Sequence, residues 1–309
     1  MRIAIFGSGG VGGYFGALLA RAGHDVSFIA RGEHLESIRQ QGLRVKTHHF
    51  GELCIRTNAT SNPTEVGVVD LVIFALKTYH NKISIPNLKP LLDSDTSVLS
   101  LQNGVESYSQ LSDILEDTHI LPGAAYIESR ISSPGEIIQN GEVVRIAFGE
   151  QEGDPTPRCM EICELFTSAQ INHELSPNVM KTLWTKFVFI VALAGPTTAA
   201  RVEMSELLQH DEGHQLVASV VKEAESVGRA QSVALNPDIF EKTMSYMEDY
   251  AKDIHASMHT DLERGRPLEL EALNGAIVRL GQAASVAVPV NHCIYSLLKP
   301  HVMGSGQQT

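Results

Sequence analysis

Short hydrophobic runs alternate with turn signals or helical patterns over the first half of the chain. Runs rich in Val, Ile and Phe predict β-strands at residues 2–6, 26–30, 69–76, 98–101 and 119–121. The run 69–76 is apolar on both faces, which is typical of a central strand that helices cover on each side. This alternation predicts an α/β fold with a mainly parallel sheet and crossover helices.

Two turn signals, Pro134-Gly135 and Asn140-Gly141, follow one another where hydrophobic and polar positions alternate. An Asn-Gly pair between two strand-like runs is a strong hairpin signal. We therefore expect an antiparallel extension of the sheet in this region, followed by a helix at residues 157–169.

The strand signal fades after about residue 177, and the remaining pattern is helical. We predict helices at residues 178–193, 203–209, 213–230, 237–256 and 269–284, and a frayed polar tail at residues 304–309. Pro177 and the change of pattern predict a boundary between an α/β domain, residues 1–177, and an all-helical domain, residues 178–309.

Composition excludes several classes of protein. The 36 acidic and 24 basic side chains give a net charge of −12, which argues against a nucleic-acid partner, because phosphate binding needs Lys and Arg. The longest apolar stretch, 187–194, is far shorter than the roughly 20 residues of a membrane span, so we expect no membrane partner. Four cysteines without a CxxC pair favour a cytoplasmic location.

A glycine-rich loop follows the first predicted strand directly, and a helical pattern at residues 11–22 follows the loop. In a GxGxxG loop the first glycine permits a tight turn, the second lets the backbone approach a pyrophosphate, and the third lets the helix pack closely on the strand. This context predicts a Rossmann-type dinucleotide-binding domain, although a glycine turn without a ligand remains the alternative. The residues that we expect to bind the cofactor here are Gly7, Ser8, Gly9, Gly10, Val11 and Gly12.

The residue after the second predicted strand indicates which dinucleotide binds. NAD sites usually place a carboxylate there, whereas this strand is followed by Arg31, whose planar guanidinium suits a 2′-phosphate. We therefore predict NADP, in its reduced form NADPH. The alternative is that Arg31 is solvated and that Glu33 binds a ribose.

Polar side chains also follow two further predicted strands. Lys77 comes after the run 69–76, and Asn103 comes after the run 98–101. Ligands in open α/β sheets bind beyond the carboxyl ends of the strands, so we expect both side chains at the cofactor site. Taken alone, Lys77 could equally be an ordinary solvated lysine.

Together these motifs resemble the ketopantoate reductase (2-dehydropantoate 2-reductase) family, and the resemblance covers nearly the whole chain. The glycine loop, the arginine, the Leu-Lys pair and the Asn-Gly pair occur in the family's order. In the helical half, Trp184-Thr185-Lys186 is similar to the family's Trp-x-Lys. The segments 257–261 and 267–275 resemble its Ser-Met-x-x-Asp and Thr-Glu-Ile-Asp-Tyr-Ile-Asn-Gly stretches.

The resemblance implies an activity, namely the NADPH-dependent reduction of ketopantoate to pantoate on the route to pantothenate and coenzyme A. It implies that Lys186 binds the substrate and protonates its carbonyl oxygen as hydride transfer produces an alkoxide. Asn103 would contact both nicotinamide and substrate, and Ser257 would contact the substrate. Glu269 would be a partner of the cofactor or of the lysine, with Arg31 and Lys77 at the cofactor's phosphates.

One departure from the family pattern concerns the substrate. The family continues Lys-x-x-x-Asn-x-x-x-Asn, whereas this chain has Ile190 and Ala194 at the two asparagine positions. Because residues four apart share a helix face, the surface beside Lys186 is apolar here. Two alternatives follow: a paralogous reductase of a more apolar 2-oxo acid, or a non-catalytic protein that senses NADPH. The expected partner is a small 2-oxo acid, and a homodimer contact through the helical half is a further expectation.

Two pairs of potential metal ligands are spaced four residues apart. His255 and His259 have a spacing that can bind zinc, but the Glu of HExxH is absent between them. Cys159 and Cys163 fall on an amphipathic helix and are interpreted as core thiols. We therefore expect no metal.

Overall fold

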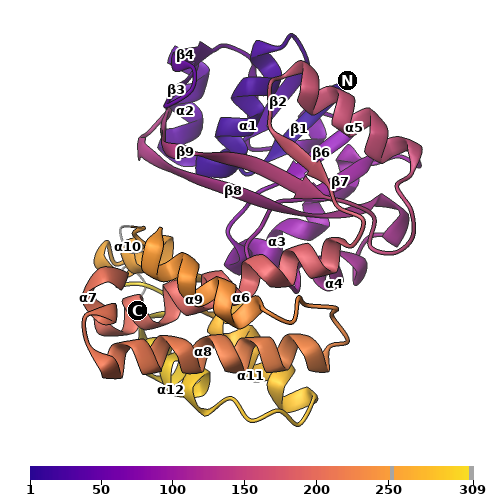
Figure 1. The fold of residues 1–309 in the computed structure, drawn as a ribbon. Coiled ribbons are helices and arrows are strands. Elements are labelled where there is room, and N and C mark those ends of the chain that lie inside the picture. The colour runs from indigo at the N-terminus through magenta and orange to yellow at the C-terminus, as the bar shows by residue number, and fades with distance from the viewer. Residues whose placement is uncertain (251–253, 306–309) are drawn as a thin grey trace. The chain divides into compact units, whose positions relative to one another are not determined.

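In the computed structural model the chain is described over residues 1–250 and 254–305. Parts of the predicted helix 237–256 and of the predicted tail 304–309 therefore lie outside the described residues. The chain divides into two compact units, one made of Met1–Gln102 and Ser107–Val179, the other of Asn103–Glu106 and Met180–Thr309 (Figure 1). The short stretch Asn103–Glu106 thus groups with the helical unit, which the sequence did not indicate.

The first unit is built around a ten-stranded sheet in the order β4-β3-β9-β8-β7-β6-β1-β2-β5, with β10 paired to β9. Its central strands β2, β1, β6 and β7 pair in parallel, and β8 and β9 form an antiparallel pair. The predicted α/β fold is therefore confirmed. The strands are β1 (Arg2–Phe6), β2 (Asp25–Ile29), β3 (Leu43–Thr47), β4 (Gly51–Ile55), β5 (Asn58–Thr60), β6 (Leu71–Phe74), β7 (Ser97–Ser100), β8 (Ile120–Ser133), β9 (Glu136–Phe148) and β10 (His173–Leu175).

Alternate residues of the central strands enter two hydrophobic cores, one on each face of the sheet. In β1, Ile3 and Ile5 belong to one core, whereas Ala4 and Phe6 belong to the other. Every residue of β6 is buried, as predicted for a strand covered on both faces. The helices of this unit are α1 (Gly10–Arg21), α2 (Gly32–Gln41), α3 (Asn81–Ser84), α4 (Ser107–Ser112) and α5 (Pro157–Ser168).

The predicted hairpin is present, but its turn was assigned to the wrong dipeptide. Pro134-Gly135 joins β8 to β9, and Gly135 has a φ of +76°. Asn140 and Gly141 lie within β9, where the pairing register with β8 shifts and Gly141 has a φ of +72°. A left-handed glycine suits an irregularity inside a strand as well as a turn, so the same dipeptide signal serves both.

The second unit is helical, which confirms the predicted fold class. Predicted helix 178–193 continues to residue 200, and predicted helix 269–284 begins with the 3-10 turn Glu269–Ala272. Two short helices, α10 and α12, were not predicted. The helices of this unit are α6 (Val179–Ala200), α7 (Met204–Leu208), α8 (Asp211–Ala230), α9 (Ile239–Asp249), α10 (Ser257–Glu263), α11 (Asn274–Ala283) and α12 (Pro289–Leu298).

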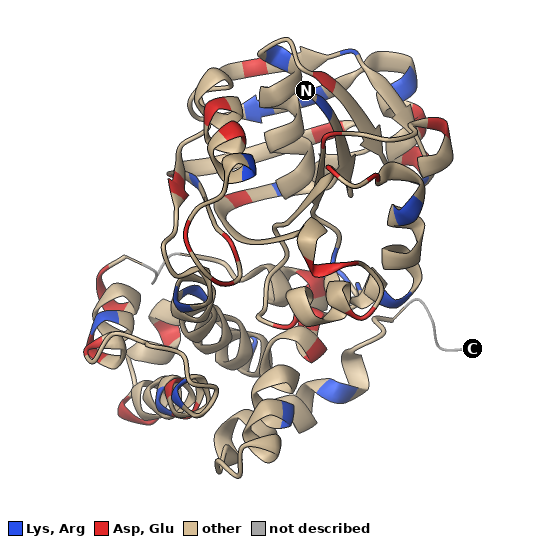
Figure 2. Cartoon of the chain, turned by 90° about the vertical axis from the view of Figure 1, so that its right-hand side faces the viewer, with Lys and Arg blue, Asp and Glu red and all other residues tan. Residues whose placement is uncertain are grey.

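Helix α6 extends well beyond the apolar stretch 187–194 and is apolar over most of its length. By length and composition alone its 22 residues, Val179–Ala200, would suffice to cross a membrane, and 67% of its most apolar window is buried inside the protein. The core helix of a globular protein has the same two properties. Charged residues are spread over both units, with basic stretches scattered among acidic ones (Figure 2).

Candidate functional site

The glycine loop begins where β1 ends, and two of its glycines are required by close backbone contacts. Gly7 has a φ of +108°, and a Cβ there would lie 2.8 Å from the backbone nitrogen of Leu76. A Cβ on Gly12 would lie 2.2 Å from the carbonyl oxygen of Gly7. Side chains at these positions would therefore break the packing of α1 against the strand ends.

The two glycines between Gly7 and Gly12, at positions 9 and 10, differ in their surroundings. A Cβ on Gly10 would lie 2.4 Å from the carbonyl oxygen of Ser129 in β8, a contact that the sequence did not indicate. A Cβ on Gly9 would meet nothing within 4 Å, so Gly9 borders open space. Gly9 is also the N-cap of α1, without a side-chain cap, and the first turn carries no acidic residue. Such a helix start offers backbone N–H groups and a partial positive charge to an anion, which fits a cofactor diphosphate.

Ser8 is held by the protein itself. Its side chain is buried, and its hydroxyl donates to the carbonyl oxygen of Ile29 at 3.1 Å. The carbonyl oxygen of Ser8 accepts a hydrogen bond from Nε2 of His34 at 2.8 Å, while Nδ1 of His34 accepts one from the Gly135 amide at 3.0 Å. Burial lowers the pKa of His34, which keeps the ring neutral for this bridging role. Sequence reasoning missed His34, because nothing in the glycine motif points to it.

Arg31 and Lys77 follow strands that lie on either side of β1. Arg31 is exposed and is the N-cap of α2, two residues after β2 ends. Lys77 is half-buried and comes shortly after β6. Burial and the positive charge of Arg31 lower the pKa of His80, three residues after Lys77, so Arg31 acts electrostatically on this segment. The ends of three adjacent parallel strands therefore carry the glycine loop and two cations.

Gln102 fixes the segment that follows β6. Its buried amide donates to the carbonyl oxygen of Leu76 at 2.8 Å and to Oδ1 of Asn81 at 2.7 Å. The next residue, Asn103, already belongs to the helical unit. Gln102 therefore holds a loop of the sheet unit, whereas the adjacent Asn103 belongs to the helical unit.

Lys186 lies on α6, and its ammonium donates a hydrogen bond to Oδ1 of Asn103 at 3.0 Å. Burial lowers the pKa of Lys186 to about 8, and the Glu269 carboxylate opposes this shift by raising it. Glu269 is 4% exposed and opens the 3-10 turn Glu269–Ala272. Asn103 and Glu269, which the sequence singled out separately, therefore both act on the Lys186 ammonium, one through a hydrogen bond and the other through its charge. Ser257, the remaining predicted substrate contact, is exposed at the first position of α10.

Packing of Trp184 positions the helix that carries Lys186. The Trp184 ring is 2% exposed and meets the Phe187 ring edge-on, with centroids 5.3 Å apart. A Cβ on Gly228 of α8 would lie 2.9 Å from the Trp184 ring, so glycine there gives the indole room. This contact fixes the rotation of α6 and hence the direction of its Lys186 face.

The face of α6 beyond Lys186 is apolar. Ile190 is half-buried and Ala194 is buried, at steps of four residues from the lysine. Asn274 of α11 packs against this helix, since its Nδ2 would be 2.6 Å from a Cβ on Gly195. Nδ2 of Asn274 donates to Oδ1 of Asn291 at 3.0 Å, and its own Oδ1 has no hydrogen-bond partner among the described residues. Sequence reasoning assigned no role to Asn274, although it lies in the resemblance segment 267–275.

Comparisons with known proteins match both halves of the chain. The family described as "Ketopantoate reductase PanE/ApbA" matches residues 3–153, and "Ketopantoate reductase PanE/ApbA C terminal" matches residues 178–302. The chain is similar to 2-dehydropantoate 2-reductases of Mesorhizobium japonicum (31% identity, 97% of each chain) and of Nostoc (30%, 96% of this chain and 94% of the relative). It is 29% identical to an uncharacterised oxidoreductase of Bacillus subtilis, over 97% of this chain and 98% of that one.

Solved structures agree with these matches. The chain resembles a PanE/ApbA family ketopantoate reductase of Ralstonia eutropha with a TM-score of 0.90, at 31% identity over 97% of this chain and 98% of the other. It shares its fold with D-mandelate dehydrogenase, solved with NADH and anilino(oxo)acetate, at a TM-score of 0.89 and 24% identity, over 97% and 98% of the two chains. Because both family domains occur in order along the chain and whole-length relatives share about 30% of its residues, the protein belongs to the ketopantoate reductase family of oxidoreductases, which use a nicotinamide cofactor.

Proposed function

We propose that the protein is an NADPH-dependent 2-oxo acid reductase of the cytoplasm that reduces ketopantoate to pantoate for pantothenate biosynthesis, with Lys186 as the proton donor. The observation that carries this proposal is the Lys186 ammonium, hydrogen-bonded to Asn103 at 3.0 Å and with its pKa lowered to about 8. Free cysteines at positions 54, 159, 163 and 293 support the location, because a reducing compartment maintains thiols.

The acidity of Lys186 suits the reduction of a ketone. When bound, the nicotinamide would supply the hydride, and the ketone oxygen then needs a proton as its negative charge develops. A lysine with a pKa of about 8 is still mostly protonated at pH 7 and is a stronger acid than an ordinary lysine. The amide oxygen of Asn103 orients the ammonium, and the Glu269 carboxylate keeps it charged.

The glycine loop and Arg31 support NADPH as the cofactor. The uncapped start of α1 would hold the diphosphate, and the open space at Gly9 would let it approach the backbone. No carboxylate stands between β2 and Arg31, which supports binding of a 2′-phosphate by the exposed guanidinium. Lys77 would add a second cation at the phosphates.

A second candidate substrate follows from the apolar face of α6. Ile190 and Ala194 replace the two amides that the family resemblance led us to expect, and they would favour a 2-oxo acid with an apolar substituent. D-mandelate dehydrogenase, which shares the fold, was solved with an anilino-substituted oxo acid. A phenyl-substituted 2-oxo acid is therefore the alternative substrate.

A substrate panel under NADPH separates these functions. Purified protein is assayed for NADPH oxidation with ketopantoate, phenylglyoxylate and pyruvate, and NADPH binding is measured by fluorescence titration. The highest kcat/KM with ketopantoate supports the proposal, whereas preference for phenylglyoxylate selects the second candidate. NADPH binding without turnover of any 2-oxo acid would identify a cofactor-sensing protein. The absence of nucleic-acid and membrane partners and the homodimer contact stay predictions.

A further inference from the structure

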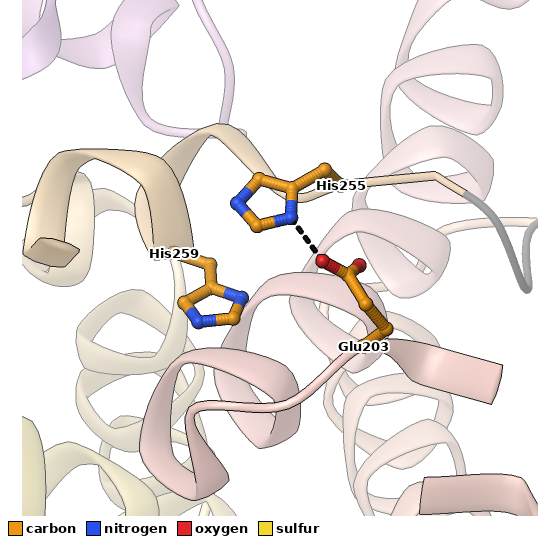
Figure 3. Close-up of side chains that lie close together, drawn as sticks. All are labelled: Glu203, His255 and His259. Atoms are coloured by element: carbon orange, nitrogen blue, oxygen red, sulfur yellow. Dashed lines mark hydrogen bonds and ion pairs between the residues drawn. The ribbon is translucent and has the colours of Figure 1, made fainter. Parts of the chain in front are cut away.

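Three potential metal ligands from separate segments of the helical unit meet in one place (Figure 3). Glu203 immediately precedes α7, His255 lies in the segment that leads into α10, and His259 lies on α10. One ligand atom of each residue lies within 4.8 Å of the other two. Nδ1 of His255 is hydrogen-bonded to Oε1 of Glu203, and the two imidazole rings stack with their centroids 4.6 Å apart.

His259 provides a second, independent observation. Its ring is 3% exposed, and neither Nδ1 nor Nε2 has a hydrogen-bond partner within the part of the chain that the structure describes. Buried side-chain nitrogen atoms almost always have a partner, because an unpaired one loses its hydration without compensation. We therefore expect a ligand from outside the protein to bind this ring.

Glu263 approaches the same two rings through their other nitrogen atoms. Its carboxylate oxygens lie 3.5 Å from Nε2 of His255 and 3.8 Å from Nε2 of His259. Histidines that bind a metal commonly donate their second ring N–H to a carboxylate, which orients the ring and raises its basicity. His255 thus has Glu203 on its Nδ1 side and Glu263 on its Nε2 side, as a metal ligand with an orienting carboxylate would.

We propose that Glu203, His255 and His259 bind one Zn²⁺ ion. Two imidazole nitrogen atoms and one carboxylate oxygen form a donor set that zinc uses, whereas Ca²⁺ and Mg²⁺ prefer oxygen ligands alone. Ligand atoms around tetrahedral zinc are about 3.3 Å apart at bond lengths of about 2.0–2.1 Å, so small side-chain movements would bring the three groups to that separation.

The ion would have a structural role rather than a part in proton transfer. It would tie the start of α7 to the segment that carries Ser257, which lies between the two histidines in sequence. Lys186, the proposed proton donor, is not one of its ligands. The zinc proposal therefore does not depend on the identity of the substrate or on turnover.

Zinc titration of the whole chain tests the site. Because the exposed thiols of Cys54 and Cys293 could bind zinc themselves, the measurements use a background in which both are replaced by serine. Chelator-treated protein is titrated with Zn²⁺ by calorimetry, and Co²⁺ is used as a spectroscopic probe of tetrahedral coordination. We expect one Zn²⁺ per chain and the visible absorption of a tetrahedral Co²⁺ site.

Matched variants identify the ligands. Glu203→Gln keeps the shape of the side chain and removes its charge, and His255→Ala truncates an exposed ring, so both avoid the buried His259. Each is expected to weaken Zn²⁺ binding by at least about tenfold. The control is His214→Ala, which removes another exposed histidine that pairs with a glutamate, Glu248, at 2.9 Å, and it should bind zinc like the background protein.

Two results would overturn the proposal. One is the absence of stoichiometric Zn²⁺ binding by the background protein. The other is equal zinc affinity in Glu203→Gln, His255→Ala and His214→Ala, which would leave the cluster as a set of ion pairs. Circular dichroism of each metal-free variant verifies that a loss of binding is not a loss of fold.

Discussion

The charge state of Lys186 depends on two opposing influences, and a hydrogen bond to Asn103 orients the ammonium. Burial removes water from the ammonium and lowers its pKa, Glu269 raises the pKa, and Asn103 accepts a hydrogen bond from Nζ. The position of Lys186 could be inferred from the Trp-x-Lys resemblance, but its acidity could not, because burial arises only when distant segments pack.

Substitution of Glu269 should change the pH dependence of catalysis in a defined direction. The lysine must be protonated to act as an acid, so kcat/KM should fall as pH rises through the pKa of about 8. Glu269→Gln removes the charge that raises this pKa, and the alkaline limb should therefore move to lower pH. The pH profile of kcat/KM for both proteins measures the shift, and an unchanged or more alkaline limb would refute this role of Glu269.

Arg31→Ala tests the choice of cofactor. If the guanidinium binds a 2′-phosphate, loss of a charge-assisted hydrogen bond should raise the KM for NADPH by roughly 10–100-fold and leave the KM for NADH almost unchanged. Arg56→Ala, at another exposed arginine of the same unit, is the control and should alter neither constant. Equal effects of Arg31→Ala on the two cofactors would contradict a role of Arg31 at the 2′-phosphate.

The glycine loop is an element in which each glycine has its own physical reason. The motif alone indicated the roles of Gly7 and Gly12, and the structure agrees with a tight turn and close packing at these positions. The contact of Gly10 with Ser129 could not be foreseen, because it needs β8 beside the loop, and β8 is much longer than the predicted strand 119–121.

Two alanine substitutions in this loop should affect different properties, namely NADPH binding at Gly9 and stability at Gly12. Gly9→Ala enters open space, and the Gly9 backbone, with φ −75° and ψ −160°, is accessible to alanine. It should preserve the free energy of unfolding and weaken NADPH binding. Gly12→Ala places a Cβ 2.2 Å from the Gly7 carbonyl oxygen and should lower the free energy of unfolding by about 1–3 kcal/mol.

Urea unfolding and cofactor titration of the two loop variants provide the measurements. Full NADPH affinity in Gly9→Ala would show that the diphosphate does not approach this loop.

The apolar character of the α6 face at Ile190 and Ala194 should determine which 2-oxo acid is preferred. Ile190→Asn introduces one of the two amides that the family resemblance leads us to expect, and it should raise kcat/KM for ketopantoate relative to phenylglyoxylate by roughly 10-fold or more. Ile83→Asn, at an isoleucine that is 69% exposed in the other unit, is the control. A ratio that is the same in both variants would exclude this face from substrate recognition.

The length of an element alone did not decide whether the sequence predicted it. Strand β1 was predicted at its observed bounds, and α8 within two residues. Helices α10 and α12, of 7 and 10 residues, were missed, although α7, of only 5 residues, was predicted within one residue at each end. The turn assigned to Asn140-Gly141 was wrong because Gly141 serves an irregularity within β9.

At the scale of the whole molecule, contacts between distant residues assemble the candidate site. Asn103 and Lys186 are 83 residues apart, and Asn103 meets the lysine because Asn103–Glu106 leaves the sheet unit and packs with the helices. The histidines of the proposed zinc site were visible in the sequence, but Glu203 lies 52 residues before His255. No local spacing rule connects residues so far apart.

The net charge of the chain and its whole-length similarity to relatives both bear on its function. A net charge of −12 disfavours binding to phosphate backbones, and the whole-length similarity to oxidoreductases gives the chain an enzymatic context. For the candidate site, the sequence alone identified the side chains, such as Lys186, Asn103 and Glu269. The distances, burial and lowered pKa that support Lys186 as the proposed acid came only from the fold.

The measurement that tests the central claim most directly is the rate of NADPH oxidation by Lys186→Ala with saturating 2-oxo acid, together with NADPH affinity by fluorescence titration. If Lys186 supplies the proton, kcat should fall by roughly 10²–10⁴-fold while NADPH binds as tightly as to the unsubstituted protein. A variant that binds NADPH normally and retains a kcat close to that of the unsubstituted protein would contradict the assignment of Lys186 as the acid.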